Sequence, residues 1–135
     1  MTFNSLRPEI QMAVEAAQDK QAVDITVLNL SGGGAFAEYF LLCSGQSQPQ
    51  IQALGEAIEE KLRHQGCRVA HREGKSSAEW VLLDYGDFVV HIFSERARQY
   101  YDLERLWRSA ERMTFPASSP PPGPQENAEG GATQQ

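Results

Sequence analysis

The segment that most constrains the fold is WVLLDYGDFVVHIF, residues 80–93, in which two apolar runs flank the four residues DYGD. Apolar runs of this length that are bounded by turn residues are typical of strands. Gly86 can supply the positive φ that a tight turn requires. We therefore predict two strands joined by a turn at residues 84–87, and a fold that contains a sheet.

Further strands and helices are predicted along the rest of the chain. Apolar and β-branched runs predict strands at residues 23–30, 38–44 and 67–71. Apolar stripes with helical spacing predict helices at residues 8–20, 47–66 and 94–113. This order of elements indicates a mixed sheet of about five strands flanked by helices, which is an α/β fold, with α+β as the alternative.

The sequence also predicts where the helices begin and end. Ser47 is followed three residues later by Gln50, which is the spacing of a capping box, and Gly66 is suited to a left-handed helix terminator. The last helix has two candidate N-caps, Ser94 and Asp102.

A chain of 135 residues has room for one domain with one core. Residues 115–135 contain five of the seven prolines and almost no aliphatic side chain, so they cannot bury enough surface to offset the entropy of ordering. We predict an N-terminal extension at residues 1–7, one domain at residues 8–114, and a disordered tail at residues 115–135. A polyproline ligand is the alternative use of the tail.

The charge pattern favours a protein partner over nucleic acid. The net charge is −6, and the arginines between Arg96 and Arg112 alternate with glutamates, so there is no clustered basic face to neutralise phosphates. A basic protein suits this balance better. No apolar stretch approaches the roughly 20 residues that a membrane span needs. Two cysteines, Cys43 and Cys67, are too few for a disulfide framework, so we expect two buried thiols in a reducing cytoplasm.

The candidate catalytic and metal-binding residues do not form a convincing site. Two carboxylates that share metal ions should project to the same side of one strand, but Asp84 and Asp87 are three residues apart and straddle a turn. We expect them to accept hydrogen bonds from turn N–H groups instead. His91 could act as a general base, although a histidine bonded to a neighbour is the simpler interpretation. We therefore predict no enzyme activity, no metal and no cofactor.

Aromatic residues that also carry a polar group gather near the predicted turn. They are Trp80, Tyr85, Tyr100, Tyr101 and Trp107. Such side chains dominate interface hot spots, at roughly 2 kcal/mol or more each, but about half of them should belong to the core. Trp107 shares a helical stripe with Leu103 and is the better core candidate, whereas Trp80 follows the polar residues SSAE and is the better interface candidate.

Four motifs in order resemble the ribosomal silencing factor family, also called the Iojap family. They are AEYFLLCSGQS (37–47), REG (72–74), WVLLDYGDFVVHIF (80–93) and YYDLERLW (100–107). The resemblance covers roughly residues 8–113. It departs from the family pattern at Glu38, at the loop GGGAF and at Ser94.

The resemblance implies a nucleotidyltransferase-like fold without catalysis. It implies that the protein binds the large ribosomal subunit through universal ribosomal protein fourteen, blocks joining of the small subunit, and represses translation when nutrients are scarce. It also implies a homodimer when the protein is free. Two alternatives are a maturation factor for the large subunit and a nucleotidyltransferase-like enzyme that uses Asp84, Asp87 and Ser47. The partner-binding residues carried over from the family are Trp80, Leu83, Asp84, Tyr85, Asp87, Glu95, Tyr101 and Leu103.

Overall fold

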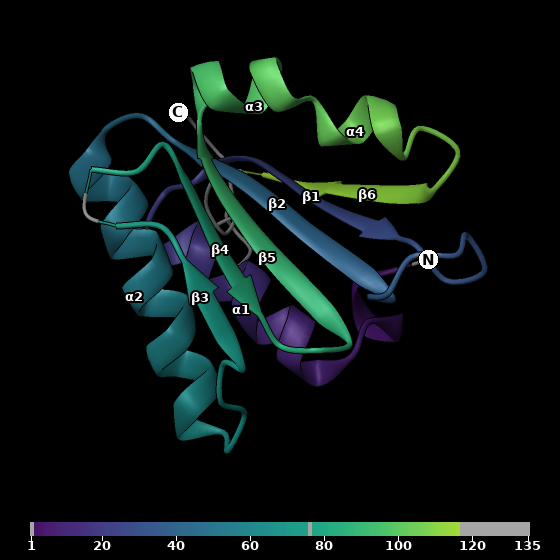
Figure 1. The fold of residues 1–135 in the computed structure, drawn as a ribbon. Coiled ribbons are helices and arrows are strands. Elements are labelled where there is room, and N and C mark those ends of the chain that lie inside the picture. Colours follow the sequence, from purple (N-terminus) through teal and green to yellow (C-terminus); the bar gives the residue numbers. More distant parts are fainter. Residues whose placement is uncertain (1, 76, 117–135) are drawn as a thin grey trace, which may run out of the picture.

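The computed structural model describes residues 2–75 and 77–116 and contains a six-stranded mixed sheet (Figure 1). The strands are β1 (Val23–Asn29), β2 (Tyr39–Gly45), β3 (His71–Glu73), β4 (Trp80–Asp84), β5 (Phe88–Ser94) and β6 (Glu111–Phe115). They are arranged in the order β3-β4-β5-β2-β1-β6. Only the central pair β2–β5 is parallel, and the other neighbouring pairs are antiparallel. The predicted mixed sheet in one α/β domain is confirmed, with one strand more than expected.

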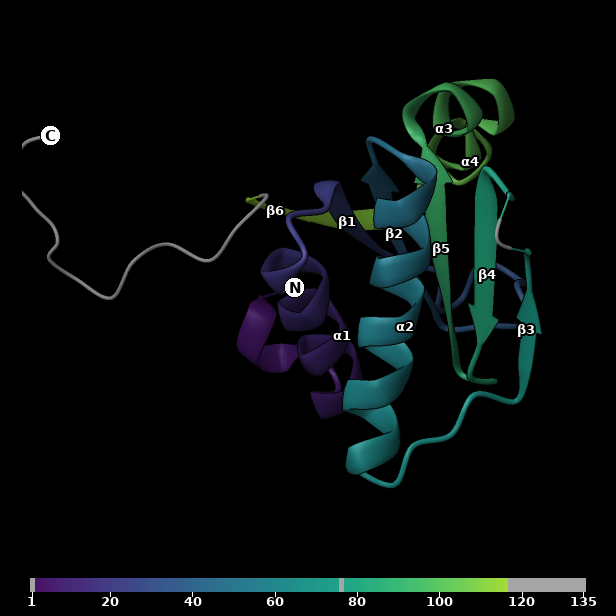
Figure 2. The ribbon, with the colours of Figure 1, turned by 90° about the vertical axis from the view of Figure 1, so that its left-hand side faces the viewer.

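The helices lie on both sides of this sheet. α1 (Pro8–Asp19) and α2 (Gln48–His64) pack side by side on one face (Figure 2). α3 (Glu95–Tyr101) and α4 (Leu103–Leu106) follow β5 and pack against the opposite face. A short 3-10 helix, η1 (Phe3–Ser5), precedes α1. No helix in the described part of the chain is long and apolar enough to cross a membrane.

The two faces of the sheet build two separate apolar clusters. The first is the main core beneath α1 and α2, where Leu41, Leu83 and Ile92 are almost completely buried. The second is smaller and lies beneath α3 and α4, with Leu42 and Phe93 among its buried members. Because side chains alternate along a strand, neighbouring residues of β2, β4 and β5 contribute to different clusters.

Several predicted element ends are confirmed. The Ser47 side chain accepts a hydrogen bond from the N–H of Gln50, and the Ser94 side chain accepts one from the N–H of Ala97. Gly66 has a φ of +81° just beyond α2. The second half of the capping box is different from the expected one, because the Gln50 side chain accepts from the N–H of Gln46, one residue before the cap.

Two predicted elements are wrong. The strand expected at residues 67–71 begins only at His71 and extends into the REG motif as far as Glu73, because pairing with β4 is available there. The helix expected at residues 94–113 ends at Tyr101, since Asp102 is left-handed with a φ of +49°. After the single turn α4 the chain returns as β6, whose backbone pairs with the free edge of β1.

The predicted boundaries at the two ends fall within ordered contacts. Leu6 is buried in the main core, and Arg7 pairs with Asp87. Phe115 ends β6, and its ring lies edge-on to that of Phe3 with the centroids 5.8 Å apart. The disordered tail was predicted at residues 115–135, but Phe115 belongs to β6; residues 117–135 lie outside the described residues.

Candidate protein-docking face

One part of the sheet is only partly covered by helices. The strand register places Trp80, Leu82 and Asp84 of β4 on the same face as Val89 and His91 of β5. Phe40 of β2 pairs with Val89 and lies on this face too. α3 and α4 cover the neighbouring end of the face. His91 is buried, whereas the other side chains on this face remain half-buried: Phe40, Trp80, Leu82, Asp84 and Val89. We call Phe40, Trp80, Leu82, Asp84 and Val89, with Tyr101 at their border, the docking face.

An aromatic cluster forms the part of this face that adjoins the helices. The Trp80 ring lies 5.0 Å from that of Phe93 and 4.5 Å from that of Tyr101, measured between centroids. The Tyr101 side chain is 50% exposed, so the cluster reaches the surface. Large aromatic side chains that are held in place but still exposed are typical anchors of protein interfaces.

His91 lies beneath the docking face and is 4% exposed. Its Nδ1 accepts a hydrogen bond from Nε1–H of Trp80 at 3.1 Å. Burial lowers the pKa of His91 to about 4, and the charge of Asp84 opposes this shift only weakly. The ring is therefore neutral at pH 7. The simpler of the two interpretations of His91 is confirmed: the ring is hydrogen-bonded to a neighbouring side chain.

The two carboxylates of the turn have separate structural partners. Asp84 accepts a hydrogen bond from the N–H of Gly86 at 2.8 Å, as expected of a turn aspartate. Asp87 was expected to accept from the turn as well, but it forms an ion pair with Arg7 instead, also at 2.8 Å. Within residues 2–75 and 77–116, no three His, Cys, Asp or Glu side chains are placed so that they could hold a metal ion.

The carried-over partner-binding residues do not lie on one surface. Trp80, Asp84 and Tyr101 share the docking face, and Leu103 is half-buried in the cluster beside it. Leu83 is completely buried on the opposite face, in the main core, where a partner cannot reach it.

Tyr85 also packs on that core, and its ring stacks on Phe88 with the centroids 4.9 Å apart. Burial raises the pKa of its hydroxyl to about 12. Asp87 is exposed at the hairpin turn, and Glu95 is exposed at the start of α3.

The motif match did not single out three residues of the docking face, because it does not distinguish the two faces of a strand. They are Phe40, Leu82 and Val89. The signal that finds them is the alternation along residues 80–84 and 88–94: once Leu83 is assigned to the core, Leu82 must face the other way.

A polar pocket of about 940 Å³ lies between β1, β6 and α3, on the far side of α3 from the aromatic cluster. Arg98 enters it from α3 and is 9% exposed. Its guanidinium donates to the carbonyl of Asp24, to the hydroxyls of Thr26 and Ser44, and to the carboxylate of Glu104. These bonds occupy the guanidinium, so Arg98 ties α3 and α4 to the sheet.

Comparisons with known proteins identify relatives of this chain. Residues 4–135 match the family described as ribosomal silencing factor during starvation. A ribosomal silencing factor of Bacillus subtilis is 43% identical over 101 residues, which cover 75% of this chain and 86% of that protein. A second, from Halalkalibacterium halodurans, is 42% identical with the same coverage. A mouse protein named mitochondrial assembly of ribosomal large subunit protein 1 is 29% identical over 73% of this chain and 45% of its own length.

Solved structures from two bacteria have the same fold. A protein of Chromobacterium violaceum superposes with a TM-score of 0.72 at 34% identity, over 80% of this chain and 88% of that one. A protein of Bacillus halodurans has a TM-score of 0.66 at 41% identity, over 73% of this chain and 91% of that one.

Proposed function

The chain belongs to the ribosomal silencing factor family, and from this premise we propose that it binds the large ribosomal subunit and prevents the small subunit from joining. The resulting block would repress translation when nutrients are limiting. The observation that carries the proposal is the half-covered apolar face of the sheet, with its exposed aromatic border, in a chain of this family.

The proposed contact on the large subunit is universal ribosomal protein fourteen. A net charge of −6 on this chain suits a basic ribosomal protein and favours fast encounter between the two. Asp84 supplies negative charge on the docking face itself. Trp80, Leu82 and Tyr101 supply apolar area for the centre of the contact. This division into an apolar centre and a polar rim is the usual anatomy of a protein interface.

The proposed mechanism is steric and requires no catalysis. A specific interface buries roughly 800 Å² on each partner, and a folded domain held by such a contact excludes any other body from the same volume. The side chains that suggest chemistry are all engaged in structural bonds: Asp84 with the turn, Asp87 with Arg7, and His91 with Trp80. We therefore propose a regulator that is not an enzyme, acting in the cytoplasm.

The same face can serve a second purpose in the free protein. A half-exposed apolar surface is unfavourable in water, and pairing two copies through it would bury it. We propose that the free chain is a homodimer joined through the docking face and that binding to the ribosome separates the two copies.

A role in maturation of the large subunit is the second candidate. It is favoured by the mouse relative, whose name refers to assembly of the mitochondrial ribosomal large subunit. Both candidates use the same partner and the same surface, and they differ in the particle that the protein meets first.

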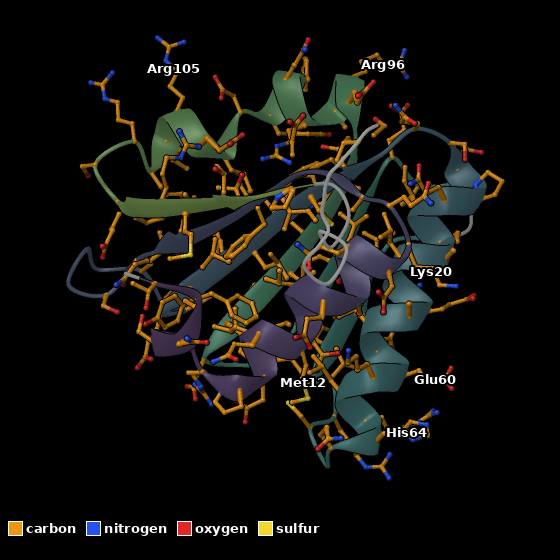
Figure 3. All side chains as sticks on the ribbon, turned by 180° about the vertical axis from the view of Figure 1, so that it is seen from behind. Met12, Lys20, Glu60, His64, Arg96 and Arg105 are labelled. Atoms are coloured by element: carbon orange, nitrogen blue, oxygen red, sulfur yellow. The ribbon has the colours of Figure 1, made fainter. Side chains whose placement is uncertain are left out.

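The test of the proposed contact is co-sedimentation of the full chain with purified large subunits. Leu82→Lys places a charge at the centre of the docking face, whereas Gln65→Lys places the same charge at the exposed end of α2, next to His64, on the far side of the molecule (Figure 3). We expect Leu82→Lys to abolish co-sedimentation and Gln65→Lys to leave it unchanged. Equal binding by both variants would rule out the docking face.

A second measurement separates the two candidates. Purified large and small subunits are mixed with and without the protein, and joined ribosomes are separated on a sucrose gradient. A silencing factor lowers the yield of joined ribosomes made from mature subunits. A maturation factor leaves this yield unchanged and instead sediments with large-subunit precursors in a cell extract.

A further inference from the structure

The buried imidazole of His91 has one nitrogen that is bonded and one that is not. Nδ1 accepts from Trp80, but Nε2 is buried and has no hydrogen-bond partner among residues 2–75 and 77–116. A polar atom buried without a partner is rare in folded proteins, and each one calls for a physical explanation.

The bond from Trp80 fixes the position of the proton on the ring. The indole nitrogen of Trp80 can only donate, so Nδ1 of His91 must be the acceptor and carries no proton. In a neutral imidazole the proton then resides on Nε2. The unpartnered atom is therefore a hydrogen-bond donor. The chain thus holds an N–H group with a fixed orientation and no acceptor.

The neighbours of His91 do not supply an acceptor: the carboxylate of Asp84, whose charge acts on the ring, accepts from the N–H of Gly86 instead. The residues paired with it across the sheet are Leu82 on β4 and Leu42 on β2, and both are aliphatic. The Phe40 ring lies edge-on at 4.4 Å between centroids, and an aromatic face is only a weak acceptor. Of these three side chains, Leu82 and Phe40 are half-buried members of the docking face. Because Nε2 is buried, a bound molecule would reach it only if these two side chains moved apart.

We propose that Nε2–H of His91 is the polar anchor of the docking face, and that it donates a hydrogen bond to a main-chain carbonyl or a side-chain oxygen of the bound protein. This inference rests on the proposed function. The role of His91 adds a requirement to the proposed function: the partner must place an oxygen acceptor against the sheet between Leu82 and Phe40. His91 acts here as a specificity residue, since a surface without such an oxygen would leave the N–H unpaired in the complex as well.

Two substitutions separate the two nitrogens of the ring. The oxygen of Asn at position 91 can replace Nδ1 and keep the bond from Trp80, but its short side chain does not reach the position of Nε2. The longer side chain of Gln can place an N–H near the position of Nε2. We expect His91→Asn to weaken binding to purified large subunits about tenfold, and His91→Gln to stay within about threefold of the unsubstituted protein.

Thermal unfolding of both variants shows whether the fold persists, and Leu82→Lys is measured in parallel. If Leu82→Lys loses binding while His91→Asn binds like the unsubstituted protein, the docking face stands and the role of His91 is overturned. If Leu82→Lys binds normally, the docking face itself is overturned, and the role of His91 with it.

A measurement on the free protein tests the first step without any partner. The ¹⁵N chemical shifts of the histidine side chains at pH 7 distinguish a protonated from an unprotonated ring nitrogen. We expect His91 to have a protonated Nε2 and an unprotonated Nδ1. A ring protonated on Nδ1, or on both nitrogens, would overturn the inference whatever the binding data show.

Discussion

Tyr101, the last residue of α3, packs its ring against that of Trp80, the first residue of β4, with the centroids 4.5 Å apart. Phe93 and His91 hold the same indole from the sheet. Trp80 is thus oriented before any partner arrives, which lowers the entropy lost on binding. The same packing means that replacing Trp80 by Ala would disturb the fold as well as the surface, so the exposed Tyr101 is the better residue to probe.

We predict that Tyr101→Ala weakens binding to the large subunit about tenfold, which is about 1.4 kcal/mol. Thermal stability should change little, because half of the side chain is exposed. The matched control is Tyr100→Ala: this neighbour is 80% exposed and packs on Tyr101 rather than on Trp80. A co-sedimentation titration measures both, and an equal loss for the two variants would contradict a specific role of Tyr101.

The stability of the protein should depend on pH through His91. Its pKa is lowered to about 4 in the folded chain, from 6.5 in the unfolded chain. As the pH falls below 6.5, the unfolded chain binds a proton that the folded chain does not, so the free energy of unfolding decreases until the pH reaches about 4. The full loss is about 3 kcal/mol.

Carboxylates titrate in the same range, so the informative quantity is a difference. Urea unfolding of the unsubstituted protein and of His91→Gln is measured from pH 7 to pH 4. We expect the stability of the unsubstituted protein to fall more steeply between pH 6.5 and pH 4. Parallel curves would mean that folding does not change the pKa of His91.

Glu104 should contribute to stability through Arg98. The Arg98 guanidinium holds the pKa of Glu104 below its usual value of 4.5, with a smaller contribution from Arg112. This stabilisation is present above pH 4.5 and is lost as the pH falls through the lowered pKa. Removing one partner of a largely buried pair leaves the other charge uncompensated, so we expect Glu104→Gln to lower the free energy of unfolding by about 2 kcal/mol at pH 7.

The control for this prediction is Glu60→Gln. Glu60 pairs with His64 on the exposed surface of α2, at 3.7 Å and with both side chains more than 60% exposed. Exposed pairs contribute little, so the expected change is within about 0.5 kcal/mol. Urea denaturation of the two variants gives the comparison, and similar losses would mean that Glu104 behaves as an ordinary surface residue.

The two cysteines should differ in reactivity. Cys43 is 0% exposed, and burial raises the pKa of its thiol to about 12. Cys67 was expected to be buried too, but it is only half-buried beside the main core, although burial also raises the pKa of its thiol. Because the thiolate is the reactive form, iodoacetamide at pH 8 should modify only Cys67 in the folded protein and both residues in denaturant. Mass spectrometry of the peptides identifies the site. Rapid modification of Cys43 in the native protein would show that β2 is accessible.

The parts of the fold that were predicted correctly have local causes. The hairpin at residues 80–94, the cap at Ser47 and the cap at Ser94 all follow from side chains within a few residues of one another. β6 has only a weak local signal: Met113 and Phe115 alternate with polar residues, but over only four residues. The strand is held by pairing with β1, which lies far away in the sequence. Tertiary context of this kind overrides local propensity.

The candidate site could be predicted only in part, because it too depends on how distant segments come together. The motif pointed to the segment that carries most of the proposed docking face, and Trp80 and Tyr101 do meet. The motif gave no information on the side of the sheet to which each residue points, and so Leu83 was included and Leu82 was not. Nor could the sequence indicate that Nε2 of His91 lacks a partner, because that depends on β2 and β5 lying side by side.

The parallel ladder between β2 and β5 has a consequence for how the protein can be inactivated. The two antiparallel hairpins, β1–β2 and β4–β5, meet only along this line, and the chain passes through α2 to connect them. Phe40 stands on one side of the seam and Val89 on the other. The β4–β5 half, with α3, carries every other member of the docking face, so a chain severed between the hairpins and allowed to come apart would lose Phe40 and, with β2, the backbone pairing that holds β5 in the sheet.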